Sequence, residues 1–378
     1  MGSTKDRTVA FAFDIDGVLM KGKKPVPGAR ETMQLLQKLK IPFIFLTNGG
    51  GHTEEAHVAQ LGQRLSLTFD EKQFVQSHTP FRDLVPVYKE KTVLVLGGHG
   101  QQIRNLAHAY GFEKVVTSSD VFVEFEHIHP FSELTKAHHE EHGRVGGSVI
   151  SKDDGTMVKG TGEKKLSLKT TPISAILVWT SPRDWCLDLQ IVNDLLLSSG
   201  GLFGTRSAKN GDETLPNCGF LQDGQPPVFF CNPDFEWSTS YDHPRFAQGA
   251  FREALRGIWR RTTRDRAELQ YSMVGKPTED TYRYAERVLV EYCGEGVEDG
   301  KKIDTVYMIG DNPESDIVGA NSFQSPRGIE WKSVLVHTGV YVPGTVPVHE
   351  PHYSVADVKE AVESTLKNEG VSTDSFCL

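Results

Sequence analysis

Residues 11–28 read FAFDIDGVLMKGKKPVPG and place two acidic residues directly after an apolar run near the start of the chain. A short continuous apolar run of this kind is typical of a strand buried on both faces of a parallel sheet. Further runs of the same character occupy 41–48, 92–98, 174–180, 227–232, 305–311 and 333–339. Between the runs, segments 29–40 and 277–293 repeat apolar residues every three or four positions, which is typical of amphipathic helices. The alternation predicts an α/β fold with a parallel sheet.

Length and composition indicate a globular chain of two domains. The chain has 378 residues, more than one hydrophobic core normally serves, and 38% of them are hydrophobic. One stretch, 136–170, is polar, rich in glycine and without periodicity, so we expect a long surface loop or an insertion there.

The charge and cysteine content exclude several classes of protein. Acidic side chains outnumber basic ones by 50 to 41, whereas proteins that bind nucleic acid concentrate positive charge, so we expect no nucleic-acid partner. The five cysteines are scattered without a CxxC pair, which disfavours a disulfide framework or a zinc site. No apolar run is long enough to cross a bilayer, and we expect no membrane span and no targeting segment. Since a removed transit peptide would leave the same start, the predicted location is cytoplasmic or mitochondrial.

Reactive side chains follow three of the predicted strands. Asp14 and Asp16 end the first run, Thr47-Asn48-Gly49 ends the second, and Asp311 to Asp316 ends a late one, while Lys276 opens the helix before it. In an open parallel sheet, ligands bind beyond the carboxyl ends of the strands. If the strands are neighbours, these groups share one pocket.

Such a pocket suits phosphoryl chemistry. Clustered carboxylates need a compensating cation, and their hard oxygen atoms suit Mg²⁺. The Asp14 carboxylate can attack phosphorus to form an aspartyl-phosphate if a metal ion, Lys276 and Thr47 neutralise the substrate. Asp16, two residues further on, can protonate the leaving oxygen and later activate water.

Each segment alone also has a structural explanation. The DxDG sequence is found in acidic turns and calcium loops, and the glycines after Asn48 can serve a turn. Lys276-Pro277 fits a helix start, and the acidic segment after Gly310 fits a capped turn. Their joint occurrence, each at the end of a strand or helix, favours the catalytic interpretation.

The four segments resemble the motifs of the haloacid dehalogenase (HAD) superfamily: DxD, Ser/Thr, Lys and GDxxxxD. The long insertion between LTN and GKP resembles class II members, in which a second domain caps the site. The segments AILVWTSPRDWCLDLQIVNDLLL, FFCNPDFEW and GKPTEDTYRYAE look like the cat-eye-syndrome critical-region subgroup of class IIA. The resemblance implies a Rossmann-like parallel-sheet core from 1–86 and 268–378, interrupted by an α/β cap domain over 87–267 with a polar insertion near 136–170.

The resemblance also implies roles for individual residues. Asp14 would be the nucleophile and a metal ligand, Asp16 the acid/base that also offers its backbone carbonyl to the metal, and Asp311 a further metal ligand. The phosphoryl group would be held by Thr47, Asn48, Gly49 and Lys276. Asp316 would be oriented toward Lys276 or a metal-bound water. Asp316 and Asn312 would position the residues that contact the metal ion and the phosphoryl group.

Two residues of the predicted cap are candidates for substrate contact. Arg183 follows the strand at 174–180, and Asp234 follows the strand at 227–232 within an Asn-Pro-Asp sequence. Asp234 either lines the site or caps the next turn.

Two other signals are weaker. The segment 93–103 imitates a dinucleotide-binding turn, but its third glycine is missing, so a plain strand-to-helix turn is favoured. Histidines crowd the region 127–142 without carboxylate or cysteine partners at a firm spacing, which favours a solvated histidine-rich surface over a metal site.

The sequence therefore predicts a Mg²⁺-dependent phosphohydrolase of small phosphorylated metabolites that works through an aspartyl-phosphate. Two alternatives stay open, namely a phosphotransferase or mutase that uses the same site and a non-catalytic binding or scaffold module. A homo-oligomer formed through the cap is a further open alternative. The identity of the substrate is not readable from these residues.

Overall fold

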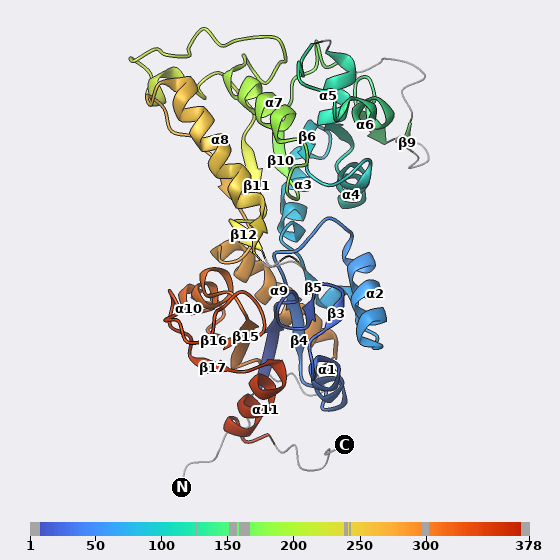
Figure 1. Ribbon diagram of the computed structural model, residues 1–378, viewed down its shortest axis with the longest axis vertical. Coiled ribbons are helices and arrows are strands. Elements are labelled where there is room, and N and C mark those ends of the chain that lie inside the picture. The colour runs from blue at the N-terminus through green and yellow to red at the C-terminus, as the bar shows by residue number, and fades with distance from the viewer. Residues whose placement is uncertain are drawn as a thin grey trace. The chain divides into compact units, whose positions relative to one another are not determined.

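The computed structural model describes residues 8–125, 127–150, 157–158, 167–237, 241, 243–296 and 302–371. The chain divides into two compact units, the first made of Met1–Pro80, Glu236–Arg245 and Val274–Leu378 and the second of Phe81–Phe235 and Phe246–Met273. In Figure 1 the two ends of the chain, blue and orange to red, belong to the first unit, and the cyan to yellow middle belongs to the second. The assignment of residues 87–267 to a cap stays a prediction.

The sheet of the first unit is entirely parallel. Its strand order is β17-β16-β15-β1-β4-β5. The strands are β1 (Val9–Phe13), β4 (Phe43–Leu46), β5 (Phe74–Val75), β15 (Thr305–Gly310), β16 (Glu330–Val336) and β17 (Tyr353–Val355). Phe13 at the end of β1 pairs with Ile309 on one side and Phe45 on the other, so β1 is central. The predicted α/β class with a parallel sheet is confirmed.

Side-chain alternation along β1 explains why helices cover both faces of this sheet. Phe11 and Phe13 belong to one core cluster, and Ala10 and Ala12 belong to another, because successive residues of a strand point to opposite faces. The first cluster includes residues of α1 (Ala29–Lys38), α2 (Glu54–Leu65) and α11 (Val358–Asn368), and the second includes residues of α9 (Glu279–Gly296) and α10 (Val318–Ser322). Because both faces of the strand are buried, its residues are apolar on both faces, which explains the continuous apolar run in the sequence.

The second unit has its own sheet, of order β14-β11-β10-β6-β7-β8-β9. Its strands are β6 (Thr92–Leu96), β7 (Lys114–Thr117), β8 (Ser148–Ile150), β9 (Met157–Val158), β10 (Ala175–Val178), β11 (Val228–Phe230) and β14 (Ser272–Met273). The pairs β7–β8 and β8–β9 are antiparallel, and the other pairs are parallel. Its helices are α3 (Val85–Tyr88), α4 (Gln102–Tyr110), α5 (Ser118–Glu124), α6 (Lys136–His142), α7 (Trp185–Leu197) and α8 (Gln248–Thr263). The structure also has two short two-stranded sheets, β2 (Met20–Lys21) with β3 (Lys24–Pro25) and β12 (Glu236–Trp237) with β13 (Arg245–Phe246).

The segment 136–170 is more ordered than its sequence predicts. Helix α6 and strands β8 and β9 lie within it, while residues 151–156 and 159–166 are outside the described residues. The surface-loop alternative is therefore wrong for the described part, and the insertion alternative stays a prediction. Helix α6 has no apolar periodicity because its buried position is His139 rather than an aliphatic residue.

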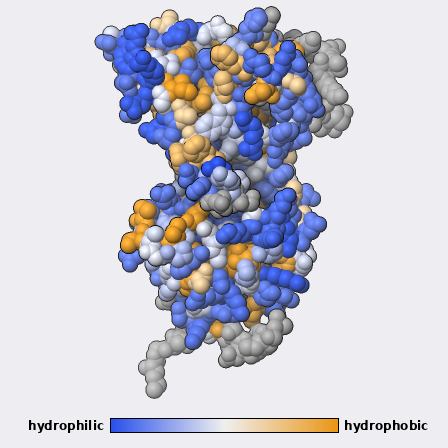
Figure 2. All heavy atoms as spheres, in the orientation of Figure 1, coloured by the Kyte–Doolittle hydropathy of each residue, from blue (hydrophilic) through white to orange (hydrophobic). Residues whose placement is uncertain are grey.

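Within the described ranges, no helix has both the length and the apolar character needed to cross a bilayer. On the face drawn in Figure 2, apolar residues are scattered among hydrophilic ones.

Candidate active site

Asp14 is the first residue beyond β1, and its backbone keeps the register of the sheet. Its amide donates to the carbonyl of Ile309 at 2.9 Å, as the ladder with β15 continues. The chain then turns sharply at Gly17, which adopts a φ of 88° and donates its amide to the Met20 carbonyl at 2.7 Å. A Cβ at position 17 would lie 2.4 Å from Oδ2 of Asp311, so both the left-handed backbone and the close approach require glycine.

Asp311 and Asp316 come from the end of β15, the neighbour of β1. Asp311 is buried, and its Oδ2 accepts a hydrogen bond from the backbone amide of Val340 at 2.6 Å. A single π turn, Pro313–Ile317, follows and brings Asp316 back toward the strand end, where its Oδ2 accepts from the amide of Asn312 at 3.0 Å. Asn312 caps this turn, since its Oδ1 accepts from the amide of Glu314 at 2.9 Å.

Lys276 lies between two of these carboxylates. Its Nζ is 2.7 Å from Oδ1 of Asp14 and 2.6 Å from Oδ1 of Asp316, and its side chain is 1% exposed. Asn48 fixes the backbone of Lys276, because its Nδ2 donates to the Lys276 carbonyl at 2.9 Å and its Oδ1 accepts from the Lys276 amide at 2.8 Å. Segments 228 residues apart in the chain are thereby joined at the strand ends.

Thr47 and Gly49 form the neighbouring wall, at the end of β4. The Thr47 amide donates to the Val75 carbonyl of β5 at 3.0 Å, and the Thr47 hydroxyl accepts from the Gly49 amide at 3.0 Å. A Cβ built on Gly49 would lie 3.7 Å from Oδ2 of Asp16, so Asp16 borders this loop. Hydroxyl and amide donors here are of the kind that bind phosphoryl oxygens.

The acids of the site are under strong mutual repulsion. Single carboxylate oxygens of Asp14, Asp311 and Asp316 all lie within 4.8 Å of one another, and all three residues are buried. Burial and the charges of Asp14 and Asp316 raise the pKa of Asp311 well above its ordinary value. Burial also raises the pKa of Asp316, to about 6, although Lys276 opposes the shift. For Lys276, burial alone would lower the pKa, but the carboxylates of Asp14 and Asp316 outweigh it and the pKa rises.

Asp16 stands apart from this cluster in its exposure. Asp16 is an exposed residue, whereas Asp14, Asp311 and Asp316 are buried. The protein atoms packed around its carboxyl group, together with the charge of Asp14, raise its pKa to about 6. A carboxyl group with a pKa near 6 exchanges a proton readily close to neutral pH.

The donor set fits a magnesium ion. Three buried carboxyl groups face a single ammonium group, and burial and mutual repulsion raise the pKa of Asp311 and Asp316, so a further cation is needed if all three are to be ionised together. Hard oxygen donors of this number and charge are what Mg²⁺ binds in sites that also receive phosphate. Asp14 and Asp311, with the backbone carbonyl of Asp16, are the groups that would hold it.

The predicted residues separate into two groups. Asp14, Asp16, Thr47, Asn48, Gly49, Lys276, Asp311, Asn312 and Asp316 all lie at the strand ends of the first unit. Arg183 and Asp234 belong to the second unit, where Arg183 lines a small pocket and the Asp234 amide donates to Oδ1 of Asn232 at 2.8 Å. Their contact with substrate stays a prediction, as do the catalytic roles of the first group.

One part of the site has no counterpart among the predicted residues. Thr338, Gly339 and Val340 follow β16, where Val340 donates to Asp311 and the Thr338 hydroxyl donates to the Gly17 carbonyl. A Cβ at Gly339 would lie 1.8 Å from Oδ2 of Asp311. The sequence could have indicated this loop, because it stands at the end of an apolar run, as the other residues of the site do.

Comparisons with known proteins agree with this geometry. Residues 11–113 match the family described as haloacid dehalogenase-like hydrolase, and residues 273–361 match a family described as HAD-hydrolase-like. A protein of Saccharomyces cerevisiae named mitochondrial hydrolase YKR070W is 35% identical over 96% of this chain and 97% of its own length. The chain belongs to the haloacid dehalogenase-like hydrolase family. The predictions that it is a HAD enzyme and that it resembles class IIA members are confirmed.

Two further matches bear on the relatives of this HAD hydrolase. A Schizosaccharomyces pombe protein named cardiolipin synthase (CMP-forming) / mitochondrial hydrolase fusion protein is 35% identical over 95% of the chain, which covers 53% of that protein. Among solved structures, a p-nitrophenyl phosphatase from Archaeoglobus fulgidus has a TM-score of 0.57 at 16% identity, covering 95% of this chain and all of the other. The structural similarity shows a shared fold.

Proposed function

We propose that this HAD hydrolase is a Mg²⁺-dependent phosphatase of small phosphorylated metabolites and that Asp14 forms an aspartyl-phosphate. The observation that carries the proposal is the Asp14 carboxylate, buried beside Asp311 and held by Lys276 at 2.7 Å. The name of the structurally similar p-nitrophenyl phosphatase supports the same reaction class.

The residues divide the reaction into two steps. In the first, a carboxylate oxygen of Asp14 attacks phosphorus, the bond from phosphorus to the leaving oxygen breaks, and the Asp16 carboxyl group gives its proton to that oxygen. In the second, the Asp16 carboxylate takes a proton from water as the water oxygen attacks phosphorus and releases Asp14. A bound Mg²⁺ supplies positive charge next to the phosphoryl oxygens.

Lys276 and the loop after β4 orient the reactants. The Lys276 ammonium holds one Asp14 oxygen in place and neutralises part of the charge that accumulates on the phosphoryl group. Thr47, Gly49 and Lys276 are the donors that we assign to the phosphoryl oxygens. In the structure Asn48 uses its side-chain amide to hold the backbone of Lys276, so we assign it a positioning role as well.

Two variants with an activated aryl phosphate test this division of labour. Asp14→Asn should abolish turnover and leave no acid-labile phosphoenzyme in a rapid-quench experiment, because an amide is a poor nucleophile. Asp16→Asn should lower turnover by about 10²- to 10⁴-fold, the usual range for a lost proton transfer. Since an aryl leaving group needs no proton, Asp16→Asn should still load Asp14 and accumulate the phosphoenzyme.

Glu314→Gln is the matched control, because Glu314 is exposed and lies on the acidic turn after β15. It should keep wild-type turnover. Equal loss of phosphoenzyme in the Asp14 and Asp16 variants would contradict their separate roles, and full turnover in Asp14→Asn would favour a non-catalytic module.

The acceptor and the location are part of the proposal. Water is proposed as the acceptor, and product analysis in the presence of competing alcohols distinguishes hydrolysis from phosphotransfer. A mitochondrial location is proposed because both yeast relatives are named as mitochondrial hydrolases, one of them as part of a fusion protein. Fluorescence microscopy of the tagged protein against mitochondrial and cytosolic markers tests it.

A further inference from the structure

Three histidines of the second unit form a cluster that the active-site chemistry does not use. His138 and His142 are one helical turn apart on α6, and His99 lies on the loop between β6 and α4. The ring centroids are 4.9 Å apart for His99 and His138, 4.7 Å for His138 and His142, and 6.1 Å for His99 and His142. We refer to these three residues as the histidine cluster.

The cluster lies beyond the carboxyl end of the central strand β6, a place where ligands commonly bind in open α/β sheets. Strand β6 has β7 on one side and β10 on the other, so the chain order reverses next to β6, and such switch points carry the ligand crevices of open α/β sheets. A pocket of about 170 Å³ opens there, lined by His99, His138, the glycines of the loop after β6 and the start of α5.

The ring positions, rather than the ring nitrogens as placed, are those of a metal site. Among the described residues only the acidic cluster has three ligand atoms within 4.8 Å of one another, so an ion at the histidine cluster requires the rings to rotate. With metal–nitrogen distances of about 2.0–2.1 Å and tetrahedral geometry, three bound imidazoles place their ring centroids about 5 Å apart. The observed separations of 4.7 to 6.1 Å bracket that value. Rotation about the histidine χ2 bond turns the ring nitrogens and leaves the centroids almost in place, and this torsion is soft.

The ring nitrogens of the cluster have no hydrogen bond to any other described residue, in contrast to neighbouring histidines. His129 and His139 both direct Nε2 at Oδ2 of Asp184, at 3.0 and 3.1 Å, and Nδ1 of His139 is 3.0 Å from the Ser119 hydroxyl. Those two histidines are structural. The cluster instead keeps its nitrogens available, with the Glu141 carboxylate 4.0 Å from Nε2 of His142 as an additional oxygen donor.

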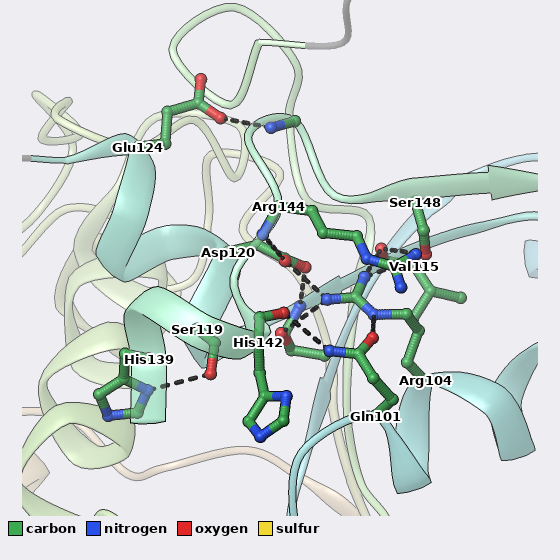
Figure 3. Close-up of polar contacts among 12 residues, drawn as sticks. Gln101, Arg104, Val115, Ser119, Asp120, Glu124, His139, His142, Arg144 and Ser148 are labelled. Atoms are coloured by element: carbon green, nitrogen blue, oxygen red, sulfur yellow. Dashed lines mark hydrogen bonds and ion pairs between the residues drawn. The ribbon is translucent and has the colours of Figure 1, made fainter. Parts of the chain in front are cut away.

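A buried polar network holds the two segments of the cluster together. The Gln101 side chain donates to the His142 carbonyl at 2.8 Å and accepts from Arg104 Nε at 2.7 Å. Arg104 is fully buried and binds Asp120 at 2.6 Å, and Asp120 also accepts from the backbone amide of Arg144. Figure 3 shows these contacts and shows the His142 ring projecting away from them. The network therefore fixes the loop against the end of α6, while the His142 side chain stays 21% exposed.

The loop itself is shaped around the His142 ring. Gly100 adopts a φ of 56°, and a Cβ there would lie 3.1 Å from Cε1 and Nε2 of His142. A side chain at position 100 would press on the ring that faces the loop. The packing of the His142 ring, as well as the backbone conformation of the turn, therefore favours glycine at position 100.

From this geometry we propose that His99, His138 and His142 bind a divalent transition-metal ion, with Zn²⁺ as the ion that imidazole ligands and a tetrahedral set favour. The bound ion would cross-link the loop after β6 to helix α6. The crowded histidines of the region 127–142 give no such prediction on their own, because the third ligand, His99, is distant in sequence.

Calorimetric titration of the full chain with Zn²⁺ in millimolar Mg²⁺ tests the proposal, because Mg²⁺ occupies oxygen-ligand sites and competes poorly for imidazole. The wild type should bind one Zn²⁺ that the double variant His138→Gln/His142→Gln does not bind. His349→Gln, outside the cluster, and Asp311→Asn, in the acidic site, should both keep it. Gln101→Ala should weaken it by about 10- to 100-fold, as loss of a group that supports metal ligands does.

A spectroscopic measurement separates a lost ligand from a lost fold. Co²⁺ bound at the cluster should give the visible absorption of a tetrahedral nitrogen-rich site, absent in the double variant, while circular dichroism and phosphatase turnover stay unchanged. Wild-type protein that takes up no Zn²⁺ in Mg²⁺, or a double variant that binds it with wild-type affinity, would overturn the proposal. Neither outcome depends on the proposed phosphatase reaction.

Discussion

Replacement of Lys276 by Met tests the electrostatic design of the acidic site. Methionine keeps most of the side-chain volume and removes the ammonium group that lies 2.7 Å from Asp14 and 2.6 Å from Asp316. The Lys276 side chain is 1% exposed, so water does not replace the lost cation easily. Two buried carboxylates, with Asp311 beside them, would face one another without compensation.

The expected cost follows from the burial of the pair. Removal of one partner of a buried ion pair costs about 3–5 kcal/mol, because the remaining charge stays desolvated. In metal-free protein, Lys276→Met should therefore lower the free energy of unfolding of the first unit by about that amount. Lys136→Met is the matched control, since Lys136 pairs with Glu140 at 3.7 Å on the surface, where such a pair contributes about 0.5 kcal/mol or less.

Urea unfolding in chelator and in Mg²⁺ measures both parts of the argument. Mg²⁺ should stabilise Lys276→Met more than it stabilises the wild type, because the ion then supplies the only strong compensation for the three acids. A variant as stable as the wild type in chelator, with an equal gain from Mg²⁺, would refute the assignment of Lys276 as the counter-charge of this cluster.

Three further predictions address the metal, the loop after β16 and a buried acid. Chelation should abolish phosphatase turnover and Mg²⁺ should restore it, and undiminished turnover in chelator would contradict the metal-dependent reaction. Gly339→Ala should weaken Mg²⁺ binding in calorimetry by at least about ten-fold, since its Cβ would lie 1.8 Å from Asp311 Oδ2, whereas Gly257→Ala, with open space around it, should leave binding unchanged. Burial and, less strongly, the charge of Asp184 raise the pKa of Asp188 to about 7, although a hydrogen bond from Ser118 opposes the shift. The protonated Asp188 carboxyl group therefore stabilises the fold fully below pH 3.8, and this stabilisation is lost as pH rises through 7. Asp188→Asn should accordingly gain stability relative to the wild type between pH 5 and pH 8, by about 3 kcal/mol, since about two units separate pH 5 from the pKa and each is worth about 1.4 kcal/mol. A constant difference in thermal unfolding across this range would show that Asp188 does not titrate there.

Much of the candidate site was predictable because its residues stand at strand ends. The apolar runs that precede Asp14, Thr47 and Asp311 are visible in the sequence, and parallel strands bring their carboxyl ends to one edge. Gly339 and Val340 follow a run of the same kind, but neither carries a reactive side chain. Their contribution is a backbone amide and the absence of a Cβ, which only the packed structure reveals.

The sequence was least informative where buried positions are polar. Helix α6 has histidines at and beside its buried position, so it shows no apolar period, and its segment was predicted to be a surface loop or an insertion. Asn48 was predicted to contact phosphate, whereas the structure also gives its amide to the backbone of Lys276, a partner 228 residues away. Hydrogen-bond partners at such distances leave no local pattern.

By itself, the sequence determined the α/β class, the family and the acids at the strand ends, because apolar runs, motif spacing and composition are local properties of the chain. The tertiary structure alone decided that β1 and β15 are neighbours, which places Asp14, Asp311 and Asp316 within 4.8 Å of one another around Lys276. It also decided that His99 meets His138 and His142. Sheet order and loop packing depend on contacts between segments far apart in the chain, and the free energy of those contacts is not encoded in any one segment.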